Sequence, residues 1–217
     1  MVAEIIGTHW KYVEKCHKPE AWEILDAAYG DLARRYHSWS HIAELLGNLE
    51  EFTYLAARSE IIGTAIFWHD SIYLTRERDG SVRADQQNET ESAALFLTQS
   101  LWSVQDGLAI RDMILASAHS KNVMLKPYYP GFEGDIDLFL DLDLSPLAAP
   151  WEAFVGNFRA IQFEFYWMHK KAFRNSQCLM LESFLKRVTI YRKAECRARW
   201  ESDARSNIMR FLDRFKK

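Results

Sequence analysis

The chain has 217 residues, which is within the size range of one domain and long enough to bury a sizeable core without disulfide or metal staples. Its formal net charge of -3 provides no basic excess for binding the phosphate backbone, so we exclude nucleic acid polymers as main partners. Three widely separated cysteines form no disulfide or zinc-finger pattern, and no apolar run approaches the roughly 18 residues of a membrane span. We therefore expect a soluble, cytoplasmic protein with no membrane partner.

Apolar residues recur with helical periodicity through the first part of the chain. Residues 20–33 and 39–57 each place apolar side chains three or four positions apart, which predicts two amphipathic helices. The stretch 60–73 is apolar on nearly every side, and a helix of that composition belongs in the centre of a bundle. The polar segment 75–87 lacks such periodicity, so we predict a mobile loop there.

The helical pattern continues after this loop. Asn88 followed by Glu91 is typical of an N-cap and capping box, so we predict that a helix begins at Asn88. The predicted helices lie at about 89–103, 106–119, 135–144, 151–172, 176–192 and 195–215. We find no strand pair with hairpin chemistry and no internal repeat. The sequence therefore predicts one all-α domain over residues 1–217, a helical bundle with its C-terminal helices (about 176–217) packed on the core.

The most informative residues are His69 and Asp70, two ionisable groups at the end of a buried apolar run. Burying a carboxylate without a partner is costly, and a cation removes that cost. Neighbours on a helix point about 100° apart, so one ion lying between these side chains can meet both. His37 and His41 are four residues apart and share one helix face. Such mixed ligands suit a divalent Mn, Fe, Co, Ni or Zn ion, and Mg is also possible.

A further ligand is expected from the acidic stretch DLFLDLDLSPL. Its candidates are Asp135, Asp137, Asp141 and Asp143. Any of these can equally be a solvated or helix-capping residue, but the leucines and Phe139 between them indicate that one face of the segment is buried.

The order H…HD…D resembles the signature of the HD superfamily of metal-dependent phosphohydrolases. Longer stretches are similar to a bacterial family of predicted metal-dependent HD phosphohydrolases, and this similarity spans about residues 20–210. The similar stretches are RRYHSWSHI (34–42), AIFWHDSIY (65–73), NETESA (88–93), LASAHS (115–120), FLDLDLSPLAAP (139–150), FRAIQFEF (158–165) and ARSNI (204–208). The resemblance implies an HD-type fold with His41, His69, Asp70 and Asp143 as the metal ligands.

Residues near these ligands in the sequence are candidates for further roles. Asp141 stays open as the last ligand in place of Asp143, and Gln162 stands where the family pattern leads us to expect an arginine. The expected catalytic residues are Asp70, His119, His37 and Glu89. The expected substrate-binding residues are Arg34 and Lys121, with Lys126 as a further phosphate contact. A plainer reading as surface or helix-stabilising residues stays open for each of these neighbours.

The function implied by the resemblance is hydrolysis of a small phosphate ester, nucleotide or pyrophosphate by a metal-activated water. Two alternatives stay open. One is an HD-type di-iron oxygenase, whose extra ligands could come from His37, His119 and Glu89. The other is a non-catalytic module that binds a metal or nucleotide. P-loop, Rossmann, nucleophile-elbow and zincin motifs are absent, which removes those classes of enzyme. The sequence does not decide between a monomer and a homodimer.

Overall fold

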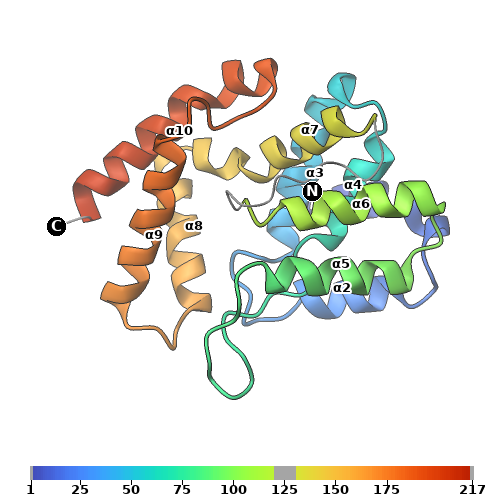
Figure 1. Ribbon diagram of the computed structural model, residues 1–217, viewed down its shortest axis with the longest axis horizontal. Coiled ribbons are helices and arrows are strands. Elements are labelled where there is room, and N and C mark those ends of the chain that lie inside the picture. The colour runs from blue at the N-terminus through green and yellow to red at the C-terminus, as the bar shows by residue number, and fades with distance from the viewer. Residues whose placement is uncertain (1, 120–130, 216–217) are drawn as a thin grey trace. The chain divides into compact units, whose positions relative to one another are not determined.

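The computed structural model describes residues 2–119 and 131–215. These residues form ten α-helices and three short 3₁₀ helices, and they contain no strand beyond one isolated bridge between His17 and Ser100. The prediction of an all-α helical bundle is confirmed (Figure 1). Within the described part of the chain, no helix is both long and apolar enough to cross a membrane.

The chain divides into two compact units, Met1–Leu142 and Asp143–Lys217. The helices of the first unit are α1 (Val2–Val13), η1 (Glu14–Cys16), α2 (Ala21–Tyr29), α3 (Trp39–Glu51), η2 (Thr53–Leu55), α4 (Ser59–Trp68), α5 (Gln87–Gln99), α6 (Val104–Ala116) and α7 (Glu133–Asp143). The helices of the second unit are η3 (Ser145–Ala148), α8 (Trp151–Glu164), α9 (Lys170–Leu185) and α10 (Ala194–Phe215). The division falls at the last residue of α7, well before residue 176, where the sequence suggests that the C-terminal helices begin.

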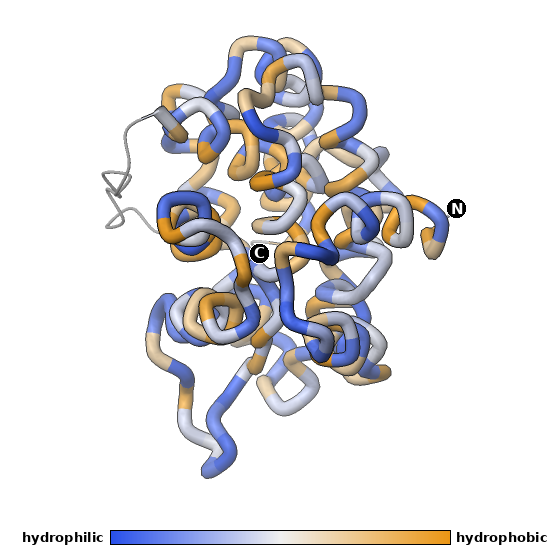
Figure 2. Tube along the Cα trace, turned by 90° about the vertical axis from the view of Figure 1, so that its right-hand side faces the viewer, coloured by the Kyte–Doolittle hydropathy of each residue, from blue (hydrophilic) through white to orange (hydrophobic). Residues whose placement is uncertain are grey.

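Helix α4 forms the centre of the first unit. Every residue from Ile61 to Trp68 is buried, and α1, α3, α5 and α6 all pack against this helix. Hydrophobic and hydrophilic residues alternate along the chain within its helices (Figure 2). A helix surrounded in this way has no face left for water, which explains why its sequence is apolar throughout. The prediction that this segment lies at the centre of the bundle is confirmed.

Asp135, in the first turn of α7, forms hydrogen bonds with the residues just before α4. Its carboxylate accepts hydrogen bonds from the backbone N–H groups of Ala57 (2.8 Å) and Arg58 (3.0 Å), which directly precede α4. The side chain is 2% exposed, so these two bonds to a charged acceptor satisfy a buried group. One of the four acidic residues considered as metal ligands therefore has a structural role instead.

The capping-box prediction at Asn88 is wrong. Helix α5 begins at Gln87, and the residue at its N-cap position is Gln86, which has a φ of 63° and makes no side-chain cap. Asn88 instead bonds in both directions with the backbone of Leu74, accepting from its N–H (3.1 Å) and donating to its carbonyl (3.1 Å). These contacts with a distant residue replace the local cap, because a side-chain amide can serve a donor and an acceptor together.

Several helix boundaries also differ from the sequence-based ones. Helix α1 was not predicted, although it buries Ile6 and Val13. Helix α8 ends at Glu164, eight residues before the predicted end at 172. Helix α9 begins at Lys170, because the side chain of His169 accepts a hydrogen bond from the N–H of Lys171 and caps the helix there.

The predicted loop 75–87 is a loop from Thr75 to Gln86, since Gln87 is already the first residue of α5 (Figure 1). Its polar residues are organised by Arg83, whose side chain is only 7% exposed. The guanidinium group donates to the carboxylates of Glu77 (3.0 Å) and Glu91 (2.6 Å) and so ties the loop to α5. The mobility of the loop stays a prediction.

Polar side chains of α10 organise the second unit. Arg205 donates to three backbone carbonyl groups between residues 185 and 188, where α9 ends. Asn207 donates to the carbonyl groups of Leu147 (3.0 Å) and Ala149 (2.8 Å) at the end of η3. Both residues belong to the ARSNI stretch, so that part of the resemblance corresponds to helix capping and packing.

Candidate metal centre

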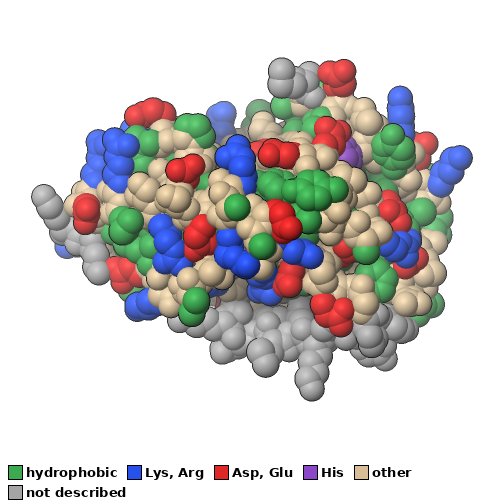
Figure 3. Space-filling view, turned by 90° about the horizontal axis from the view of Figure 1, so that it is seen from above, with side chains coloured by type: hydrophobic (Ala, Val, Ile, Leu, Met, Phe, Trp, Pro, Cys, Tyr) green, Lys and Arg blue, Asp and Glu red, His purple; other side chains and the backbone are tan. Residues whose placement is uncertain are grey.

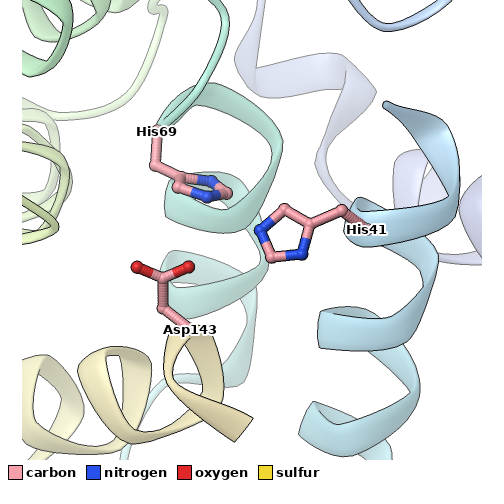
Figure 4. Close-up of side chains that lie close together, drawn as sticks. All are labelled: His41, His69 and Asp143. Carbon is pink, nitrogen blue, oxygen red and sulfur yellow. The ribbon is translucent and has the colours of Figure 1, made fainter. Parts of the chain in front are cut away.

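Three predicted ligands from distant parts of the sequence meet in the structure. His41 lies in the first turn of α3, His69 directly follows α4, and Asp143 is the last residue of α7. Their side chains point toward one another, and one ligand atom from each lies within 4.8 Å of the other two (Figure 4). Two atoms that each bind one ion at about 2.0–2.6 Å lie at most about 4–5 Å apart, so this set fits a single divalent ion.

The chemistry of the donor set also fits a metal ion. His41 and His69 are 4% and 2% exposed, and two imidazoles with a carboxylate are typical ligands of divalent transition metals. The Nδ1–H of His69 donates to the carbonyl of Ile66 at 2.9 Å, which leaves Nε2 as the ligand atom. Nε2 lies 3.0 Å from Oδ2 of Asp70, a separation at which both atoms can bind one ion.

Asp70 lies beside this group of three. Its carboxylate is 3.0 Å from the imidazole of His69 and 3.9 Å from that of His41. Burial acts to raise the pKa of Asp70, but the nearby imidazoles of His69, His37 and His41 outweigh burial and hold the pKa well below its usual range. The carboxylate is therefore ionised at neutral pH, as a metal ligand requires.

Two of the predicted catalytic residues surround Asp70. The ring of His37 stacks on Tyr73, with 3.6 Å between the ring centroids and 21° between the planes, and its charge lowers the pKa of Asp70. Glu89 lies in the first turn of α5. Burial raises the pKa of Glu89, and the negative charge of Asp70 raises it further, which shows that the two carboxyl groups are within electrostatic range. Tyr73 was not singled out in the sequence.

The structure also distinguishes among the remaining candidates. Asp143 rather than Asp141 belongs to the group of three, and Asp141 is buried in the last turns of α7. His119 follows α6 with a φ of 49° and is not in the group. Lys121 and Lys126 lie outside the described residues. Gln162 is a half-buried residue of α8 in the second unit.

Arg34 has a different environment from the one expected for a phosphate-binding residue. Its guanidinium group donates to the backbone carbonyls of Asp70 (2.7 Å) and Ser71 (3.2 Å), and it lies over the ring of Tyr29 at 5.7 Å. The hydroxyl of Tyr29 donates to the carbonyl of Phe67 at 2.8 Å. Sequence reasoning missed Tyr29, because helical periodicity shows only that its ring is buried.

Comparisons of the chain with protein-family models, with curated proteins and with solved structures find no match in any of the three. The resemblance to the HD superfamily therefore stays a prediction made from the residues themselves. The geometry of His41, His69 and Asp143 stands independently of it.

Proposed function

We propose that this chain is a divalent-metal-dependent phosphohydrolase that acts on a small phosphate ester, nucleotide or pyrophosphate. The observation that carries the proposal is the convergence of His41, His69 and Asp143 within 4.8 Å, next to the ionised carboxylate of Asp70. Four protein groups do not fill an octahedral coordination shell, so a phosphoryl oxygen and a water have room to bind.

The proposed chemistry divides between the ion and the chain. A divalent ion, when bound, polarises a phosphoryl oxygen and lowers the pKa of a bound water toward about 7. Asp70 accepts a hydrogen bond from that water and orients it. His37, which Tyr73 holds beside Asp70, donates a proton to the leaving oxygen, and Glu89 accepts the proton that the water releases.

The surface supports a small substrate over a polymer. Lys, Arg, Asp and Glu side chains are mixed on the face drawn in Figure 3, with no broad area of one sign. A protein that tracks a nucleic acid backbone needs a continuous basic surface. The net charge of -3 points in the same direction.

The test combines elemental analysis with a phosphate-release screen. Purified protein is analysed for bound metals and then assayed on a panel of phosphate esters, nucleotides and pyrophosphates with Mn²⁺, Co²⁺, Ni²⁺ and Mg²⁺. We expect release by the wild type and none by His69→Ala. His9→Ala is the matched control, because it removes an imidazole that pairs with Glu50 on the surface and is not in the group of three.

Two outcomes would contradict the proposal. No phosphate release on any substrate, together with two iron ions per chain, would favour the oxygenase alternative. No release and no bound metal would favour a non-catalytic module.

A further inference from the structure

The predicted ligands His69 and Asp70 lie just beyond the C-terminal end of α4, where the last carbonyl groups of a helix have no partner within the helix. The turn satisfies some of these groups itself. His69 donates through its backbone N–H to Ala65 (2.9 Å) and through its ring to Ile66 (2.9 Å). Ser71 donates to the carbonyl of Trp68 through its backbone N–H (3.2 Å) and its hydroxyl (2.9 Å).

Three other carbonyl groups of this turn receive hydrogen bonds from a different part of the chain. Tyr29, the last residue of α2, donates its hydroxyl to the carbonyl of Phe67. Arg34 donates one N–H to the carbonyl of Asp70 at 2.7 Å and another to that of Ser71 at 3.2 Å. The guanidinium group lies over the ring of Tyr29, 5.7 Å from its centroid and within the range of a cation–π interaction, so the two side chains support the same turn.

From this arrangement we infer that Arg34, supported by Tyr29, is a positioning residue for the metal centre. It fixes the peptide groups of Asp70 and Ser71, and through them the directions of the Asp70 carboxylate and the His69 imidazole. This role rests on the proposed function, because it requires that a metal ion binds at His41, His69 and Asp143. It differs from the phosphate-binding role that the sequence suggests for Arg34.

The geometry requires an arginine in particular. Two carbonyl groups on successive residues lie side by side, and the planar guanidinium fork presents two N–H groups to them together. A lysine keeps the positive charge, which also favours a helix C-terminus, but its single ammonium cannot reproduce the fork. Replacing Arg34 by lysine therefore tests the shape of the guanidinium group separately from its positive charge.

The experiment measures Co²⁺ binding by the full chain, through the visible absorption of the bound ion, for wild type, Arg34→Ala, Arg34→Lys and Tyr29→Phe. We expect Arg34→Ala and Arg34→Lys to bind Co²⁺ about 10- to 100-fold more weakly and with an altered spectrum, as is usual when the partner of a metal ligand is lost. Methylguanidinium added to Arg34→Ala should restore both the affinity and the spectrum. Arg35→Ala is the matched control, because it removes the same charge from the exposed neighbouring residue.

The outcomes separate the possible roles. If wild type and Arg34→Ala bind Co²⁺ with the same affinity and spectrum, the inference is wrong, and a rise in KM for phosphate substrates alone would return Arg34 to substrate binding. If wild type binds no Co²⁺, the proposed function fails, and this inference fails with it. Should Arg34→Ala not fold, Tyr29→Phe removes only the hydroxyl bond to Phe67, and an unchanged affinity and spectrum in Tyr29→Phe and Arg34→Lys would overturn the inference.

Discussion

Replacing Asp135 by alanine should destabilise the protein by about 2–4 kcal/mol. The change removes two charge-assisted hydrogen bonds, 2.8 and 3.0 Å long, and leaves the N–H groups of Ala57 and Arg58 without their acceptor at the start of α4. A hydrogen bond to a charged group contributes about 1.5–3 kcal/mol, and a partly buried N–H group left without an acceptor costs about 1–3 kcal/mol. The side chain is 2% exposed, so water does not readily take its place.

The assay is urea unfolding followed by circular dichroism, with a chelator present so that bound metal does not contribute to stability. Asp135→Asn should lose about half as much stability as Asp135→Ala, because the amide keeps one acceptor oxygen. Asp137→Ala, from the same helix but a half-buried position, is the control. A free energy of unfolding for Asp135→Ala within about 0.5 kcal/mol of wild type would refute the structural role of Asp135, since that is the range of ordinary surface substitutions.

Three further predictions concern the metal, pH and the loop. At a free Co²⁺ concentration of about 100 times Kd, wild type should gain about 2.7 kcal/mol of stability, and Asp70→Ala should gain much less, as measured by urea unfolding with and without the ion. Burial lowers the pKa of His17, so the unfolded chain binds a proton more readily than the folded one. Stability should therefore fall as pH decreases below the ordinary value of 6.5, and chelator-treated His17→Gln should lose this part of the pH dependence in urea titrations. Arg83→Ala removes both ion pairs that hold segment 75–87, so limited proteolysis should cut there faster than in wild type; equal cleavage rates would count against that role.

The central helix and the ionisable pair at its end are predictable from the sequence because both follow from the hydrophobic pattern. An apolar stretch from Ile61 to Trp68 has to be buried, and the ionisable residues His69 and Asp70 at its end then need a partner. The structure supplies His41 and Asp143 beside them. This reasoning requires only the local hydrophobic pattern and no knowledge of tertiary contacts, so the sequence is sufficient for it.

Side-chain hydrogen bonds near the ends of helices are less predictable, because they depend on which distant groups come near. Asn88 has the local pattern of an N-cap, yet its side chain bonds with Leu74. Asp135 has no local pattern that points to α4, yet it accepts hydrogen bonds from the two residues just before that helix, 78 and 77 residues away in the sequence. Local propensity is a weak prior when a tertiary contact competes with it.

The choice between Asp141 and Asp143 shows why the last ligand could not be derived from periodicity. Leucine and aspartate alternate in this segment with a period of two, whereas an α-helix turns about 100° per residue, so the two aspartates point in directions about 200° apart. The alternation does not show which side of the helix faces the core, because α7 is buried on nearly all sides from Leu138 to Leu142. Only the position of the end of the helix separates the two residues: Asp143 is the last residue of α7 and lies with His41 and His69, while Asp141 lies within the buried turns. A helix end beside two histidines is a tertiary fact, so no local pattern in the sequence encodes it.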